Sequence, residues 1–206
     1  MTLRSSAILC ASRPHGEHGA VVRLLTADDG LLAAYLAGAR GRQLRPLLVP
    51  GNRLEIELRP RGDGRLPSAR IELLESRGPW LAEPLPAAGI DWVTTLTAAT
   101  LPEGHPYPAL YEALGATLDA ICQAPSARGW AQALAAYEAL LLRELGYGLA
   151  EASRPAAADW PALLERLRRQ GGAIESRLLA ERRRDVMGAR AILLERLGRI
   201  SGEGKS

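Results

Sequence analysis

The feature that most constrains this chain is a change of hydrophobic periodicity near residues 78–79. Before this point, short apolar runs bounded by turn residues predict β-strands at residues 6–13, 19–26, 30–37, 52–59 and 66–74. In the fourth run, Leu54, Ile56 and Leu58 alternate with charged residues, as in a strand with one buried face. Beyond residue 80, apolar residues recur at spacings of three and four, which is typical of amphipathic helices. The pattern therefore indicates an α+β protein.

The five strands predict a small closed sheet. Five short strands in about 75 residues suit a five-stranded antiparallel β-barrel of the OB type, since closure removes the exposed sheet edges. Turn signals at residues 13–16 and at Asp28-Asp29-Gly30 join the first strands. Pro67 indicates that the fifth strand is an edge or carries a bulge. The longest connection, residues 38–52, follows the third strand.

The second half of the chain predicts helices at residues 87–101, 107–123, 127–145, 160–170 and about 173–197. Gly146 ends the third helix, Asp159 caps the fourth, and Gly171-Gly172 breaks the chain before the last. We therefore expect an OB-type barrel domain at residues 1–78 and an all-α domain at residues 79–206.

Composition excludes several classes of protein. With 206 residues, 47% hydrophobic and 24% charged, the chain has the balance of a globular protein rather than a disordered one. It contains no run of 18 apolar residues that predicts a membrane span, and residues 1–13 do not match a secretory signal. Cys10 and Cys122 lie in no C-x-x-C pair, so neither a disulfide framework nor a zinc site is expected. These features favour a cytoplasmic location.

Charge is distributed unevenly along the chain. Residues 1–78 carry a net charge of +4, residues 79–160 carry −6, and residues 161–206 carry +5. Arginine supplies all basic residues except Lys205, as expected of a GC-rich genome. A genomic bias would fall evenly along the chain, so the two basic ends are the better indication of an acidic partner.

Catalytic motifs are missing from the sequence. It has no G-x-x-x-x-G-K-[ST] loop, G-x-S-x-G turn or H-E-x-x-H pair, so we predict no catalytic residues, no cofactor and no enzymatic activity. His15 and His18 have H-x-x-H spacing but lie in a predicted turn with only Glu17 beside them. A solvated turn is expected there rather than a metal site.

A basic loop follows the third strand. Residues 38–45 carry Arg40, Arg42 and Arg45 among glycines that allow close approach of a ligand, and guanidinium groups pair well with phosphate oxygens. The same residues also fit a solvated loop with no ligand. Arg13 and Arg23 are candidates to extend this DNA-binding surface. Because only one aromatic residue lies in the first 79 positions, binding by charge rather than by base stacking is expected.

The last third of the chain carries two arginine clusters. One cluster consists of Arg166, Arg168 and Arg169, and the other of Arg182, Arg183 and Arg184. Both clusters are candidates for binding DNA or an acidic peptide. The alternative is a solvated basic face that binds no ligand. Consecutive residues point in different directions around a helix, so the three arginines of a run do not all face one ligand.

Several of these stretches, taken in order, resemble a known family. In the barrel they are residues 7–17, 30–32, 38–40 and 50–52, and in the helical part residues 101–114 and 137–149, where Leu145-Gly146-Tyr147-Gly148-Leu149 is the most characteristic. Together they resemble RecO, the bacterial recombination mediator family. The family resemblance covers most of residues 6–149 and resumes loosely from residue 163.

The resemblance implies a DNA-repair protein that is not an enzyme. Members bind single- and double-stranded DNA, anneal complementary strands and help to load RecA onto strands coated by single-stranded-DNA-binding protein (SSB). They act together with RecR and recognise the acidic C-terminal tail of SSB. Such a protein is expected in the cytoplasm, associated with the nucleoid.

The chain departs from the family pattern after Leu149. Many members have a four-cysteine zinc knuckle there, whereas residues 151–158 contain no cysteine, so the resemblance is to a short member without that zinc site. Two other classes stay open on the residues alone: an OB-fold RNA-binding protein, and a protein–protein scaffold. A preference for RNA over DNA would indicate the first, and no salt-sensitive binding of nucleic acid would indicate the second.

Overall fold

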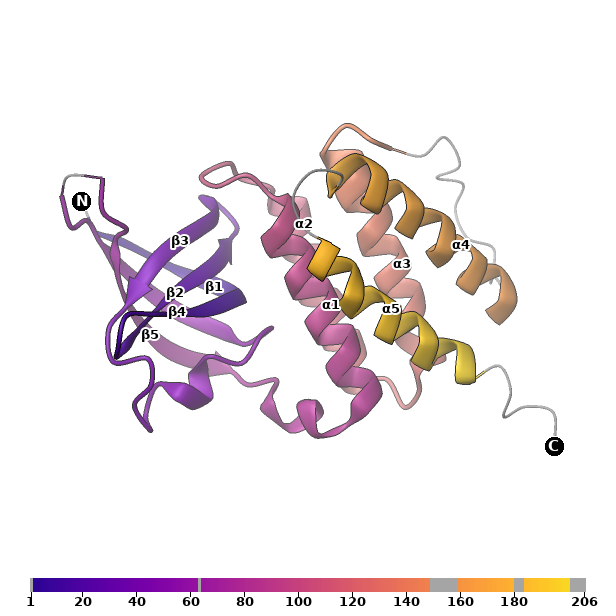
Figure 1. Cartoon of the computed structure of the whole chain (residues 1–206), viewed down its shortest axis with the longest axis horizontal. Coiled ribbons are helices and arrows are strands. Elements are labelled where there is room, and N and C mark those ends of the chain that lie inside the picture. Colours follow the sequence, from indigo (N-terminus) through magenta and orange to yellow (C-terminus); the bar gives the residue numbers. More distant parts are fainter. Residues whose placement is uncertain (1, 63, 149–158, 180–183, 201–206) are drawn as a thin grey trace. The chain divides into compact units, whose positions relative to one another are not determined.

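The computed structural model describes residues 2–62, 64–148, 159–179 and 184–200, and Figure 1 shows the elements in chain order. The described chain forms two compact units. The barrel unit consists of Met1–Ala82 with Leu101–Glu112, and the helical unit of Glu83–Thr100 with Ala113–Ser206. The short segment between the first two long helices thus belongs to the barrel unit, although it follows a helix of the other unit.

Five strands make up the barrel. They are β1 (Leu3–His15), β2 (Gly19–Thr26), β3 (Gly30–Leu36), β4 (Arg53–Arg59) and β5 (Ser68–Glu75). They form a closed barrel in the order β1-β2-β3-β5-β4, which confirms the predicted fold class. The long first strand makes closure possible, because its first half pairs with β4 and its second half with β2.

The barrel is not antiparallel throughout. A ring of five strands cannot alternate direction at every step, so one neighbouring pair must run parallel. This pair is β3 and β5, which is joined only at Tyr35 and Ser68, with the Tyr35 amide donating to the Pro67 carbonyl over 2.8 Å. Pro67 comes directly before β5, and a bulge lies where β4 and β5 meet at Arg53–Leu54.

Side chains of alternate residues fill the barrel interior. The core consists of Ala7, Leu9, Ala20, Val22, Leu24, Ala34, Leu36, Ala39, Leu54, Ile56, Leu58, Ala69 and Ile71. The predicted alternation in the fourth run is confirmed, because Leu54, Ile56 and Leu58 are the buried members of β4.

The first predicted turn begins later than expected. Arg13 and His15 still belong to β1, where Arg13 is the register partner of Val21. The turn is made at residues 16–18, and Gly16 has φ of +66°. The local signal at Arg13-Pro14-His15-Gly16 predicts a turn, but β2 continues to pair with β1 through Pro14 and His15. The turn therefore begins only at Gly16. At the next hairpin, Gly30 has φ of +71°, as the predicted turn requires.

Five α-helices follow in the part of the chain that the structure describes. They are α1 (Pro84–Thr100), α2 (Pro108–Gln123), α3 (Ala127–Glu144), α4 (Trp160–Ala173) and α5 (Arg184–Arg199), with short turns η1 (Arg45–Leu47), η2 (Gly78–Ala82) and η3 (Ile174–Leu178). Among the described residues, none of these helices is long and apolar enough to cross a membrane.

Local signals at the ends of α3 and α4 are confirmed. Gly146 has φ of +84°, and the Tyr147 amide reaches back to the Leu142 carbonyl over 2.7 Å, which ends α3. Asp159 accepts a hydrogen bond from the Ala162 amide at 2.9 Å and caps α4.

The predicted break at Gly171-Gly172 is wrong. Helix α4 continues through both glycines, and the predicted last helix at 173–197 is instead the turn η3 and the shorter α5. Gly171 is needed for packing rather than for a break: a Cβ there would lie 2.2 Å from Nη1 of Arg190. A glycine weakens a helix by only about 1 kcal/mol, which tertiary packing outweighs.

A buried ion pair lies inside the helical unit. Arg190 and Glu138 are 3% and 0% exposed and are joined over 2.8 Å. The Trp92 indole donates to the same carboxylate over 2.8 Å, and Arg190 also donates to the Leu167 carbonyl. The network links α1, α3, α4 and α5, so it orders the packing of the helices.

Candidate nucleic-acid interface

The arginine-rich loop after β3 is anchored at both ends. Ala39 is buried in the barrel core, and Leu44 packs against that core. Backbone hydrogen bonds from Gly41 to the Gly38 carbonyl at 2.8 Å and from Arg45 to the Gly41 carbonyl at 3.0 Å fold the loop on itself. The loop is therefore ordered before any ligand arrives, which lowers the entropic cost of binding.

Buried Asn52 holds the far end of this loop. Its side-chain amide donates to the Leu47 carbonyl over 3.0 Å, and its oxygen accepts from the Arg77 amide over 2.7 Å. Asn52 was not among the predicted functional residues; its polar side chain directly before an alternating strand was the available signal for a structural role.

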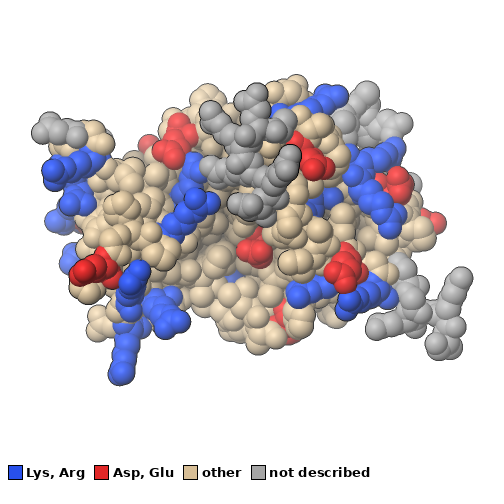
Figure 2. All heavy atoms as spheres, in the orientation of Figure 1, with Lys and Arg blue, Asp and Glu red and all other residues tan. Residues whose placement is uncertain are grey.

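The predicted loop arginines are solvent-exposed. Arg40, Arg42 and Arg45 are exposed, as is Arg13 at the end of β1. Within the described part of the chain no ion pair involves any of these four residues. Their guanidinium groups are thus available to an external anion. On the face shown in Figure 2, basic side chains over the barrel gather in separate groups rather than in one continuous patch.

Arg13 lies apart from the loop arginines in the sequence, on the outer face of β1, β2 and β3. Strand register places Arg13 beside Val21, and Val21 beside Tyr35, so the three side chains form a row across three strands. Neighbouring strands are about 4.8 Å apart, which puts Arg13 and Tyr35 roughly 10 Å from each other.

Tyr35 is held by its surroundings. Its ring lies against Gly19, where a Cβ would be 2.4 Å from the tyrosine oxygen. Its centroid is 4.9 Å from the guanidinium carbon of Arg61 and 6.0 Å from the ring of His15, which meets it edge-on. Arg61 was not among the predicted site residues; the basic composition of the β4–β5 turn was the available signal.

The structure places Arg23 differently from the other candidates. Its Nη2 atom donates to Oε1 of Glu103 over 2.9 Å, and its side chain is only 21% exposed. Glu103 lies in the segment after α1 that joins the barrel unit, 80 positions along the chain. Sequence spacing contains no signal for this pairing.

The described C-terminal candidates differ in their exposure. Arg166 is half-buried and donates to the Ala135 carbonyl over 3.5 Å, whereas Arg168 and Arg169 are exposed on α4 and Arg168 pairs with Glu165. Arg182 and Arg183 lie outside the described residues, as does the segment 151–158; Arg184 begins α5.

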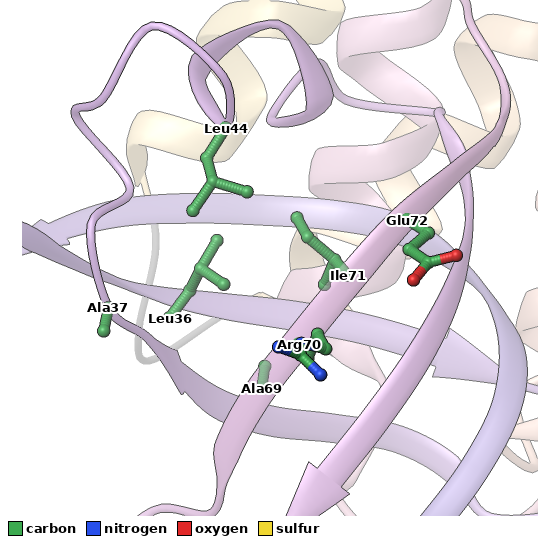
Figure 3. Close-up of a pocket in the computed structure, with 7 residues that line it drawn as sticks. All are labelled: Leu36, Ala37, Leu44, Ala69, Arg70, Ile71 and Glu72. Atoms are coloured by element: carbon green, nitrogen blue, oxygen red, sulfur yellow. The ribbon is translucent and has the colours of Figure 1, made fainter.

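A small cavity lies between the loop and the barrel wall. Its volume is about 300 Å³, and Figure 3 shows Leu36 from β3, Leu44 from the loop and Ile71 from β5 pointing toward one another. Ala37, Ala69, Arg70 and Glu72 complete the lining. The cavity is apolar at its centre, with Arg70 and Glu72 as its charged side chains.

Other candidate chemistry in the described residues is limited. His15 and His18 are exposed, and no group of three potential metal ligands occurs in residues 2–62, 64–148, 159–179 and 184–200. Cys10 is fully buried, and this burial raises the pKa of its thiol to about 12. The thiol is therefore protonated at neutral pH and a poor nucleophile.

The fold and the site define a class: an OB-type barrel with an ordered arginine loop, followed by a helical unit. Comparison with known proteins agrees with this architecture. Residues 1–77 match the family model "Recombination protein O N terminal", and residues 85–156 match "Recombination protein O C terminal". The chain belongs to the RecO family.

Curated relatives extend this match. The chain is 37% identical over 150 residues to the DNA repair protein RecO of Caulobacter vibrioides (strain NA1000 / CB15N), covering 72% of this chain and 60% of the relative. It is 38% identical over 150 residues to the DNA repair protein RecO of Ruegeria sp. (strain TM1040), covering 72% and 61%. The chain thus spans about three fifths of the length of these relatives.

Proposed function

We propose that this chain is a DNA-binding recombination mediator in DNA repair. The observation that carries the proposal is the group of exposed arginines Arg13, Arg40, Arg42 and Arg45, which lie on an OB-type barrel and have no ion-pair partner among the described residues. OB-folds bind oligonucleotides, and their affinity for the phosphate backbone comes from such side chains. Membership of the RecO family supports the same conclusion.

Two contacts are proposed for a bound strand. The loop arginines pair with phosphates, and the outer face of β1–β3 receives the neighbouring nucleotides, with Arg13 beside the Tyr35–Arg61 stack. Because Arg61 already lies over Tyr35, which is the only Phe, Trp or Tyr residue of the barrel strands, charge rather than base stacking dominates binding. Arg23 contributes only when its ion pair with Glu103 opens.

Annealing and the loading of RecA are proposed because the chain belongs to the RecO family. We propose that the protein binds single- and double-stranded DNA, anneals complementary strands, and helps RecR to load RecA onto SSB-coated strands. In this proposal the barrel at residues 1–78 binds nucleic acid and residues 79–206 bind partners. Exposed Arg168 and Arg169 on α4 suit an acidic peptide such as the SSB tail. The protein acts without catalysis, cofactor or metal, at the nucleoid in the cytoplasm.

The first test is fluorescence anisotropy of a labelled single-stranded oligonucleotide across a salt series. Charge reversal of two loop arginines, R40E/R42E, is expected to weaken binding at least tenfold. The slope of log K against log salt should become shallower by about 1.4, because each lost phosphate contact on a single strand contributes about 0.7. A matched control, R143E/R199E, changes the net charge equally at two exposed arginines of the helical unit.

Each result distinguishes the proposal from its rivals. Equal weakening by both double variants would show that total charge, not the loop, determines binding. Tighter binding of matched RNA than of DNA would favour an RNA-binding protein. Absence of salt-sensitive binding by the unmodified chain would favour a protein–protein scaffold.

A further inference from the structure

The segment 101–112 crosses the barrel surface as a strap. The Gly104 amide donates to the Leu31 carbonyl over 3.0 Å, beside a parallel bridge between Leu31 and Glu103. Gly30 admits the strap closely, since a Cβ there would lie 1.9 Å from the His105 carbonyl oxygen. The Tyr111 hydroxyl lies 3.3 Å from the Ser6 hydroxyl at the end of the strap. The strap is thus fixed to the start of β3 and to β1.

The strap places the Glu103 carboxylate beside Arg23, on the outer face of β1–β3 that is proposed to bind DNA. Strand register pairs Arg23 with Ala11 and Arg13 with Val21, so Arg13 and Arg23 are diagonal neighbours on one face, roughly 7–8 Å apart at Cβ. Glu103 forms an ion pair with Arg23 over 2.9 Å, whereas Arg13 has no ion-pair partner among the described residues. One of two adjacent cations is therefore neutralised by the chain itself.

The exposures of the two partners differ. The Arg23 side chain is 21% exposed, so the barrel holds it in place, and the Glu103 side chain is 54% exposed and borders water. Rotation of Glu103 away from the barrel would leave Arg23 in position without this ion pair. A carboxylate and a phosphate offer a guanidinium group the same kind of oxygen acceptors, so one can replace the other.

We propose that Glu103 competes with a DNA phosphate for Arg23 and so limits the affinity of the barrel for DNA. This inference rests on the proposed DNA-binding function. The exchange breaks no covalent bond: the phosphate takes the place of the carboxylate, and Glu103 passes into solvent. Binding and strap opening are coupled in both directions, because a ligand that displaces Glu103 also weakens the strap contact at Leu31–Gly104.

The test is E103Q, assayed with a labelled single-stranded oligonucleotide of mixed sequence across a salt series. Binding is expected to tighten about three- to tenfold, since a surface ion pair and a repulsive charge next to the phosphate are both removed. The salt slope should steepen by about 0.7, because one more phosphate contact forms without displacing a carboxylate. The control E112Q removes an exposed carboxylate elsewhere in the barrel unit.

Two further measurements separate competition from a merely structural role. In an R23Q background, E103Q should bring no gain in affinity. In the unmodified chain, hydrogen exchange at the Gly104 amide should become faster when DNA is bound, because the strap has lost its ion pair.

The outcomes are distinguishable. If E103Q binds as the unmodified chain or as E112Q does, or if its gain persists in R23Q, competition at Arg23 is overturned while the proposed function stands. If the unmodified chain binds no DNA at low salt, both are overturned.

Discussion

The barrel unit and the helical unit both depend on arginine, but they use its guanidinium group in different surroundings. In the barrel unit, Arg40, Arg42 and Arg45 are exposed and have no ion-pair partner among the described residues. In the helical unit, Arg190 is 3% exposed and donates to Glu138 and to the Leu167 carbonyl. The residue type is the same, and burial and partner decide its role.

In an arginine-rich sequence, burial therefore decides whether an arginine stabilises the fold or is available for binding. A buried guanidinium group must have its charge paired and its donors satisfied, so its removal affects folding. An exposed group is solvated in the unbound chain, so its removal affects binding. Arg23 is intermediate: it is largely covered, and its partner comes from the strap.

The largest expected effect is on Arg190. We expect R190M to lower the free energy of unfolding by about 3–5 kcal/mol, because it leaves the Glu138 carboxylate buried without its counter-charge. Urea denaturation followed by circular dichroism measures this. In the double variant R190M/E138Q, a neutral oxygen still accepts from Trp92, and most of the loss should be recovered. A loss below about 1 kcal/mol in R190M would contradict the structural role of this pair.

The next effect compares two neighbouring glycines of α4. We expect G171A to destabilise the chain by about 2 kcal/mol, because its methyl group displaces the Arg190 side chain from its ion pair. In contrast, a Cβ at Gly172 has no atom within 4 Å, so G172A should stabilise by about 0.5–1 kcal/mol through helix propensity. Thermal and urea unfolding of both variants measures the difference. Equal effects of the two changes would show that Gly171 does not serve the ion pair.

A smaller effect concerns the acid stability of the barrel. Hydrogen bonds from Arg59, then from Arg4, hold the pKa of Glu57 below its usual value. The native state therefore binds a proton less readily than the unfolded chain, so this stabilisation is present above the ordinary carboxyl pKa and is lost as pH falls through the lowered one. We expect E57Q to make the decrease of stability between pH 5 and 3 shallower. Urea denaturation at several pH values measures this. The same decrease of stability in E57Q and in the unmodified chain would be evidence against a contribution from Glu57.

The smallest expected effect is on the folding stability of the loop variants. Neutralising all three loop arginines in R40Q/R42Q/R45Q should change the free energy of unfolding by less than about 0.5 kcal/mol, because the side chains are exposed and form no ion pair with any residue that the structure describes. Oligonucleotide affinity should still fall in the same variant. If stability fell by several kcal/mol, the loop arginines would resemble Arg190 rather than a binding surface.

Much of the fold was predictable because the relevant signals are local. Alternation in residues 53–59 follows from one buried face, and Gly30 and Gly146 stand where a positive φ is needed. The helix predicted at residues 107–123 is also confirmed: α2 spans Pro108–Gln123, and Leu110, Leu114 and Leu118, at spacings of four, are fully buried. Each of these patterns extends over a few residues, so periodicity and turn chemistry are sufficient to recognise it.

Local signals were misleading where a distant segment changes the balance. Two consecutive glycines predict a break, yet α4 continues because Arg190 needs the space at Gly171. Arg13 and Pro14 predict a turn, yet the ladder with β2 extends through His15. In the first case, packing outweighs a helix propensity worth about 1 kcal/mol per glycine. In the second case, pairing with β2 outweighs a local turn preference.

The sequence by itself determined the order of five strands and the helices after them, the arginine loop and the family, but not the end of α4 or of β1. Tertiary structure alone decided that Glu103 reaches Arg23, that Arg61 covers Tyr35, and that β3 closes the barrel against β5. The physical reason is that these contacts join residues 26 to 80 positions apart or whole strands. Their energies depend on positions in space that no local pattern of the chain encodes.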